Sequence, residues 1–211
     1  RALQLWQQSL EIKERIGDVQ GKAATLANMA WAAGQAGDQA RRDELNRQAA
    51  KALGSVRAYL DLITVLGNLG TSAQGEREIF AAQAAWLVLM VQPPVDAASR
   101  VLGLLFQLVP QGDALEPLLG AAATIVVATR GENHPQKEKL RDGAAKLLSI
   151  AASNAGIESE EAFEPWFAEN RLNESTHVFP RLLALLEQLV GDGWLFDRAP
   201  LLQRNDSTSA G

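Results

Sequence analysis

The chain has 211 residues and a formal net charge of −5, and 47% of its residues are hydrophobic, 21% charged and 6% aromatic. The lack of cysteine excludes disulfide bonds and thiolate metal sites and suits the reducing cytoplasm. The acidic balance disfavours nucleic acid as the main partner, and the longest strongly apolar run, residues 79–91, falls short of the roughly 20 residues that span a membrane.

Alanine and leucine supply most of the apolar residues, and both favour helices, whereas no β-branched or aromatic run predicts a strand. Apolar residues at helical spacing predict the first three helices at residues 2–16, 21–36 and 39–53. Short glycine-containing turns end them, at Gly17-Asp18, Gly37-Asp38 and Gly54-Ser55. Because the helical pattern already includes Arg1, we expect the chain to be part of a longer protein.

Seven further helices with looser patterns are expected at residues 59–69, 76–91, 95–109, 114–129, 134–155, 160–172 and 177–190. Three of these helices have an expected capping residue at their start. The caps are Asp113, which forms a capping-box pattern with Glu116, then Asn133 and Thr176. Pro165 and Pro180 predict bends or short helical pieces.

Glycines at expected helix ends recur at Gly37, Gly70, Gly112 and Gly156, with spacings of 33, 42 and 44 residues. Two helices per period of this length are typical of an α-solenoid, in which stacked hairpins bury one another's apolar faces. We therefore predict an all-α fold, a right-handed solenoid of about five antiparallel hairpins. We expect regular TPR-like repeats at residues 1–92. Residues 93–199 are expected to form degenerate hairpins and a C-terminal cap, and to continue the solenoid of residues 1–92. Residues 200–211 are expected to form a disordered tail.

Two stretches place small and large apolar residues at fixed positions: ALQLWQQSLEIKERIGD (residues 2–18) and GKAATLANMAWAAGQAGD (residues 21–38). On these stretches, residues 1–53 resemble tetratricopeptide (TPR) repeats of the bacterial and partner-of-Inscuteable-like variety, which have about forty residues per unit. The chain departs from the family pattern at Gln39, Arg42 and Asn46, where an aromatic, a small and an apolar residue are expected. The resemblance weakens over residues 56–91.

The resemblance implies a concave groove lined by the first helix of each unit, where a peptide or a partner helix binds. Asn28 falls where the family often uses an asparagine to hold a peptide backbone, and an amide suits this because it both donates and accepts. The residues that the resemblance assigns to partner binding are Asn28, Trp31, Gln35, Arg57, Asp61, Thr64 and Asn68.

Residues with obvious catalytic or metal-binding patterns are scarce. The two histidines, His134 and His177, lack a partner at metal-ligand spacing, and no phosphate-binding or nucleophile motif occurs. We therefore expect no metal, no cofactor and no enzymatic activity.

The C-terminal region is the most aromatic part of the chain, with Phe163, Trp166 and Phe167 close together and Trp194 and Phe196 later. These residues could seal the last hairpin or form a docking patch.

The preferred function is a protein-interaction module that binds a peptide or helix of a partner, or of another domain of the same protein, with no role for a membrane. A second hypothesis is a structural element that forms homodimers through residues 79–109 or the aromatic C-terminus, and a remote one is a helical enzyme that uses carboxylates.

Overall fold

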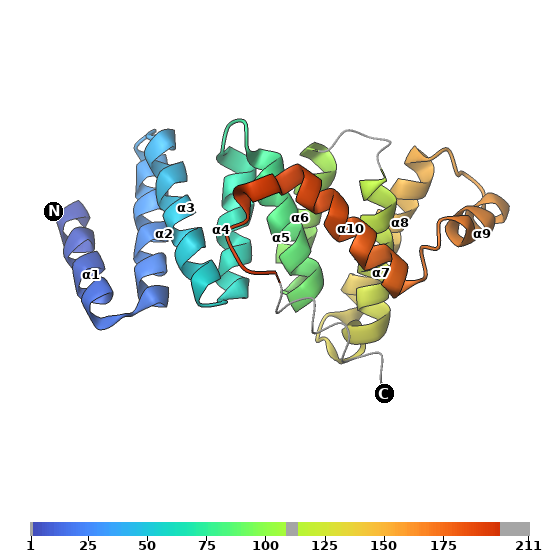
Figure 1. Cartoon of the computed structure of the whole chain (residues 1–211), viewed down its shortest axis with the longest axis horizontal. Coiled ribbons are helices and arrows are strands. Elements are labelled where there is room, and N and C mark those ends of the chain that lie inside the picture. The colour runs from blue at the N-terminus through green and yellow to red at the C-terminus, as the bar shows by residue number, and fades with distance from the viewer. Residues whose placement is uncertain (1, 109–113, 199–211) are drawn as a thin grey trace. The chain divides into compact units, whose positions relative to one another are not determined.

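A computed structural model describes residues 2–108 and 114–198, and over these residues the fold is all-α without a strand (Figure 1). The expected tail at residues 200–211 lies outside the described residues. The α-helices are α1 (Ala2–Ile16), α2 (Val19–Gln35), α3 (Gln39–Ser55), α4 (Tyr59–Ser72), α5 (Arg77–Val91), α6 (Val95–Leu108), α7 (Leu115–Arg130), α8 (Lys137–Asn154), α9 (Glu160–Glu169) and α10 (Ser175–Val190), and two 3-10 turns, η1 (Gly131–Asn133) and η2 (Gly191–Gly193), complete them. No described helix is both long and apolar enough to cross a membrane.

The described chain divides into two compact units. Unit 1 comprises residues 2–84 together with residues 192–198, and unit 2 comprises Ala85–Gly191. The division falls inside α5, which therefore contributes its first half to unit 1 and its second half to unit 2.

Unit 1 begins with four consecutive helices, each of which packs on the next one in the chain (Figure 1). Three turns of the same geometry join them, and their left-handed residues are Gly17, Gly37 and Arg57, each 20 residues from the next. In each turn, that residue and the one after it donate their N–H groups to carbonyls three and five residues back, which satisfies the free C=O groups at the helix end. A repeating unit of two helices with their turns therefore has a length of 40 residues.

Aspartates begin two of these helices in the same way. Asp18 accepts a hydrogen bond from Gly21 N, and Asp38 accepts one from Arg41 N. The expected end of a helix at Gly70 is wrong, because Gly70 is buried within α4, which continues to Ser72.

The C-terminal segment 192–198 returns to unit 1 and packs against α3, α4 and α5. Gln83, which is fully buried, donates to the carbonyl of Gly193 (3.1 Å) and accepts from the N–H of Leu195 (2.8 Å). Phe196 meets Tyr59 edge to face, with ring centroids 6.3 Å apart. Gly54 allows this close approach, since a Cβ there would lie 2.2 Å from Leu195 O. We call residues 192–198 the strap.

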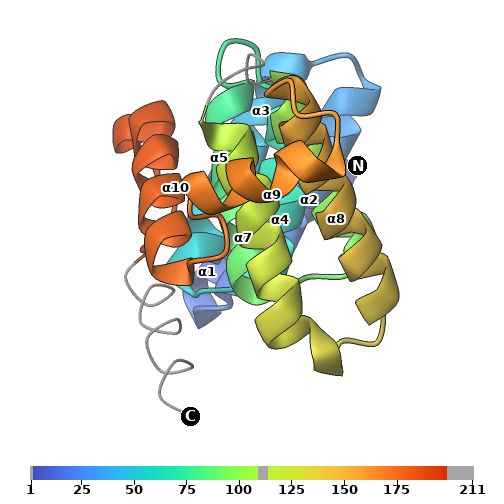
Figure 2. The ribbon, with the colours of Figure 1, turned by 90° about the vertical axis from the view of Figure 1, so that its right-hand side faces the viewer.

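Unit 2 is built around α7, which packs on α8 and α10. Trp86 on α5 is fully buried and meets Phe179 of α10 edge to face at 6.5 Å. Gly120 of α7 allows close packing, because a Cβ there would lie 2.9 Å from the Cα of Leu148 on α8. Figure 2 shows α8 and α10 on opposite sides of α7.

Two expected helix starts in unit 2 differ from the structure, and a third expectation cannot be compared with it. Asn133 lies in η1, and α8 begins only at Lys137, after Gln136. Thr176 lies inside α10, which follows Glu174. Asp113 lies outside the described residues, while the Glu116 carboxylate turns inward and accepts a hydrogen bond from Asn154 Nδ2 at 2.7 Å.

Candidate functional site

Unit 1 contains a cleft of about 490 Å³ among α2, α3 and α4. Its wall on α2 includes Trp31 and Gln35, which lie four residues apart and therefore share one face of the helix. The opposite face of α2 carries the buried residues Leu26, Met29 and Ala30 and holds the helix in place. The remaining polar residues of the cleft come from α3 and α4, and they are Arg42, Asn46, Asn68, Thr71 and Ser72.

Trp31 is the most exposed aromatic residue that flanks this cleft. Its relative accessibility is 68%, although an indole side chain gains more from burial than most side chains. An exposed tryptophan beside a hollow is a frequent feature of binding surfaces, where tryptophan is enriched among the residues that contribute most energy.

An ionic network of Ser72, half-buried Arg42 and buried Asp43 lies beside the cleft, and Arg42 and Ser72 are part of its lining. Both Nε and Nη2 of Arg42 lie 3.0 Å from Asp43 Oδ1, and Ser72 Oγ donates to the same oxygen at 2.8 Å. The arginine stem fits because Gly34 faces it, and a Cβ on Gly34 would lie 3.1 Å from Arg42 Cδ. The buried Asp43 carboxylate is thus paired and hydrogen-bonded, which offsets the cost of removing it from water.

The sequence-predicted binding residues occupy different places in unit 1. Trp31, Gln35 and Asn68 line the cleft. Three further predicted residues lie on the helices that carry these lining residues but outside the lining itself. They are Asn28 on α2 and Asp61 and Thr64 on α4, and all three are exposed.

Arg57 lies apart from this cleft lining. It occupies the turn before α4 with a φ of 58°, and it lines a separate hollow together with Lys51 and Trp194 of the strap. The other six residues lie within helices, so Arg57 is the one predicted binding residue that the structure puts in a turn.

Four polar residues of the cleft were not predicted to bind: Arg42, Asn46, Thr71 and Ser72. Arg42 and Asn46 carried a signal, because both depart from the TPR pattern by placing a polar side chain where a small or apolar one is expected. Thr71 and Ser72 lay beyond the expected end of their helix and gave no such signal.

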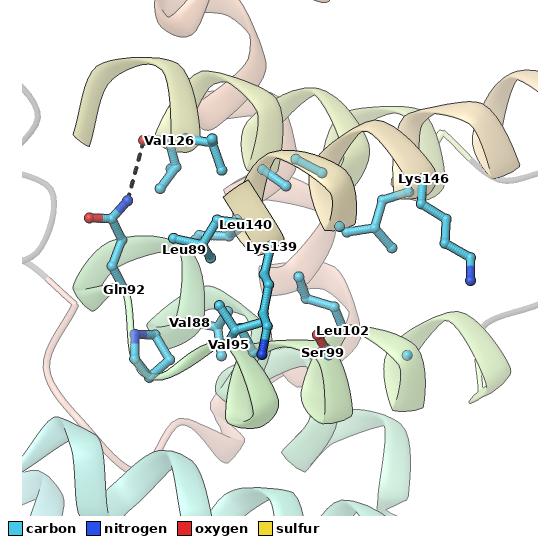
Figure 3. A pocket seen from close by; sticks show the side chains of 18 of the residues that line it. Val88, Leu89, Gln92, Val95, Ser99, Leu102, Val126, Lys139, Leu140 and Lys146 are labelled. Atoms are coloured by element: carbon cyan, nitrogen blue, oxygen red, sulfur yellow. Dashed lines mark hydrogen bonds between the residues drawn. The ribbon is translucent and has the colours of Figure 1, made fainter. Parts of the chain in front are cut away.

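Unit 2 contains a second hollow, a groove of about 320 Å³ between α6 and α8, with α5 and α7 beneath it (Figure 3). Most of its lining is aliphatic, including Leu89, Leu102, Val126 and Leu147. Gln92 at one end is held by a hydrogen bond from its Nε2 to Val126 O at 3.4 Å (Figure 3).

Two lysines of α8, Lys139 and Lys146, are the only charged residues among the described residues that line this groove. Both side chains are exposed. No described carboxylate lies within ion-pair distance of either ammonium group, whereas the neighbouring Arg141 pairs with Glu132 and Glu138. The groove is therefore an apolar trough beside two unpaired positive charges.

Both histidines and Glu174 make local contacts. Nδ1 of His134 accepts a hydrogen bond from Gln136 N at 3.1 Å, and His177 contacts Arg181. Hydrogen bonding to Arg171 is the main cause that lowers the pKa of Glu174. The described residues contain no group of three or more histidine, aspartate or glutamate side chains placed to hold a metal ion.

Comparison of the chain with protein-family models, with curated proteins and with solved structures gives no match. Functional inference therefore depends on the chemistry of the cleft and the groove, together with the sequence resemblance of residues 1–53.

Proposed function

We propose that unit 1 is a protein-interaction module that binds a peptide segment in the cleft among α2, α3 and α4. The observation that carries this proposal is the exposed Trp31 beside a hollow lined by the amides of Gln35, Asn46 and Asn68. The peptide belongs to a partner protein or to another domain of the same protein, and the role is recruitment in the cytoplasm rather than catalysis.

The regular spacing of the turns supports a repeat architecture for this unit. Gly17, Gly37 and Arg57 occupy equivalent turns at 20-residue intervals, which gives the forty-residue hairpin of the TPR variety that the sequence resembles. We infer a right-handed TPR-like solenoid, in which α2 and α4 are the first helices of successive units and line the concave face.

The side chains of the cleft suit an extended backbone. An amide can donate to a peptide C=O and accept from a peptide N–H at once, and Gln35, Asn46 and Asn68 supply three of them. Trp31 offers a flat apolar surface for one side chain of the ligand. A peptide with an apolar or aromatic anchor between polar residues fits this arrangement.

The charge of the cleft narrows the ligand further. Arg42 is the only charged residue among the described residues that line it, and its guanidinium is already paired with Asp43. A ligand carboxylate would have to compete with a buried, hydrogen-bonded partner for that cation. We therefore expect neutral peptides to bind better than acidic ones.

The test is selection from a random peptide library with the whole chain as bait, followed by titration of the selected peptides. Trp31→Ala should weaken their binding about thirtyfold, the loss typical of a central tryptophan anchor. Asn68→Ala should weaken it about fivefold, because one uncharged hydrogen bond contributes about 1 kcal/mol. Ile12→Ala is the matched control, since Ile12 is an exposed apolar residue on α1 away from the cleft.

Peptides that bind wild type and Ile12→Ala equally well but lose affinity for Trp31→Ala would support the proposal. A library that yields no binder, or binders that are indifferent to Trp31→Ala, would overturn it.

A further inference from the structure

The groove between α6 and α8 is open along both of its sides. A Cβ built on Gly103 of α6 or on Gly143 of α8 would meet no atom within 4 Å, so neither glycine is required by close packing. Ile150, at one end of the lining, is 39% exposed. An aliphatic trough with such open walls has room for side chains from another helix.

Helix α9 of the same unit has the complementary character. Phe163, Trp166 and Phe167 occupy positions i, i+3 and i+4 and form one aromatic face, with the rings of Phe163 and Phe167 stacked at 5.6 Å. The three aromatic side chains are half-buried, and none of the ten residues of α9 is fully buried. In Figure 1, α9 lies at the end of unit 2, beyond α8. An i, i+3, i+4 aromatic face is the usual anchor pattern of a helix that binds in a groove.

The charges of the two surfaces also match. Helix α9 contains four glutamates and no lysine or arginine, and its first turn holds Glu160 and Glu161. The α6–α8 groove is flanked by Lys139 and Lys146, neither of which pairs with a described carboxylate. Opposite charges at the rim of an apolar contact fix its register and orientation.

The lengths agree as well. The part of α8 that lines the groove runs from Lys139 to Ile150, which is about 17 Å at 1.5 Å per residue, and the ten residues of α9 span about 15 Å. The whole aromatic face of α9 can therefore contact the groove.

We propose that α9 of one copy of the chain docks into the α6–α8 groove of a second copy. If each copy gives its α9 and receives the other, the two contacts are equivalent and the assembly closes as a symmetric dimer. The proposal concerns unit 2 and does not depend on peptide binding by unit 1.

Anchors on both sides of α9 disfavour docking within one chain. At its C-terminal side, Leu172 is 1% exposed and its N–H bonds to Phe167 O, which fixes the end of the helix. At its N-terminal side, Ser159 caps α9, and Ile157 N–H bonds to Ala152 O of α8. For α9 to dock in its own chain, it would have to move relative to two of these anchors, the buried Leu172 and the bond from Ile157 to α8, whereas docking to a second copy leaves both in place.

The first experiment measures mass by light scattering over a concentration series of the full chain. We expect a concentration-dependent dimer. Trp166→Ala removes a central aromatic anchor from both contacts of the dimer, so it should weaken the dimer about thirtyfold for each contact and about a thousandfold in total. Gly143→Leu, which fills the groove from an open position, should weaken it similarly. Ser149→Leu is the matched control, because it adds the same side chain to an exposed position of α8 outside the groove.

Mixing variants identifies the occupant. Gly143→Leu has a blocked groove and an intact α9, whereas Trp166→Ala has an intact groove and a weakened α9. Each alone should be mainly monomeric, but their mixture should form a heterodimer through one complete contact. Circular dichroism and thermal melting of each variant establish that both are folded.

Lysine reversal tests the charges. Lys139→Glu/Lys146→Glu should weaken the dimer, and adding Glu160→Lys/Glu161→Lys to that variant should restore it in part.

A chain that stays monomeric at every concentration would overturn the proposal. So would a dimer that survives both Gly143→Leu and Trp166→Ala, or a mixture of the two variants that fails to associate. A monomer that instead binds dodecanoate in a manner that depends on Lys139 and Lys146 would assign the groove to a small anionic amphiphile and would equally overturn it.

Discussion

The cleft of unit 1 and the groove of unit 2 are both hollows among packed helices, but their linings are opposite in chemistry. The cleft is lined by amides and by Arg42, which pairs with Asp43 beside it, whereas the groove is aliphatic with lysines only at its edge. The buried carboxylate beside the cleft, Asp43, is paired with Arg42 and hydrogen-bonded to Ser72, which offsets the cost of its burial. The same helical scaffold can thus offer a surface for a hydrogen-bonded backbone in one place and for apolar anchors in another.

Two tryptophans give the largest expected contrast between core and surface. Trp86→Ala removes a fully buried side chain from unit 2 and should lower the free energy of unfolding by about 3–5 kcal/mol. Trp31→Ala removes an exposed one from the cleft and should change it by less than about 0.5 kcal/mol. Denaturant titrations followed by circular dichroism measure both values. Equal losses for the two variants would contradict the assignment of Trp31 to a binding surface.

The next largest effect concerns the strap. In Gly54→Ala, the new Cβ would lie 2.2 Å from Leu195 O, so the strap or α3 must move. We expect a loss of about 1–3 kcal/mol, the usual cost of overpacking. Hydrogen exchange should also accelerate at Leu195 N–H, whose partner is Gln83. Unchanged exchange at Leu195 would show that the strap does not depend on this close approach.

Gly103→Ala is the counterpart in unit 2, and its expected effect is smaller and opposite in sign. Gly103 lies inside α6, where a Cβ would meet no atom within 4 Å, so alanine should stabilise the helix by about 0.5–1 kcal/mol. Thermal melting measures the change. A destabilised variant would mean that this wall of the groove is already in contact with something.

The smallest expected effect is electrostatic. A hydrogen bond from Arg171 lowers the pKa of Glu174 below its ordinary value of 4.5. A lowered folded-state pKa contributes stability above the unfolded-state pKa, and that stability is lost as the pH falls through the folded-state pKa. Glu174→Gln should therefore be slightly less stable than wild type at neutral pH, and the difference should disappear in acid. A difference that persists in acid would contradict this account.

The sequence predicted local structure well where turn chemistry is explicit. Gly17-Asp18 and Gly37-Asp38 set the bounds of α1, α2 and α3 to within about two residues, because glycine allows the left-handed turn and aspartate caps the next helix. Where other residues begin a helix, as at Gln136 before α8, the expected start was wrong.

Long-range contacts carried little signal in the sequence. Gln83 appeared only as one polar residue in an apolar run, and its strap partners Gly193 and Leu195 lie more than 100 residues later. The cleft was predicted in part: the TPR resemblance pointed to Trp31, Gln35 and Asn68 on α2 and α4. On α3, Arg42 and Asn46 stood out as polar departures from the TPR pattern, but that local signal did not show that both line the same cleft.

Hydrogen–deuterium exchange of the whole chain, with and without a library-selected peptide, tests the central claim most directly. The account predicts that the peptide slows exchange in α2 and α4, around residues 27–35 and 61–72, and leaves residues 139–150 beside the groove unchanged at dilutions where the chain is monomeric. Slower exchange confined to residues 88–150, with none in α2 and α4, would contradict the assignment of peptide binding to the cleft of unit 1.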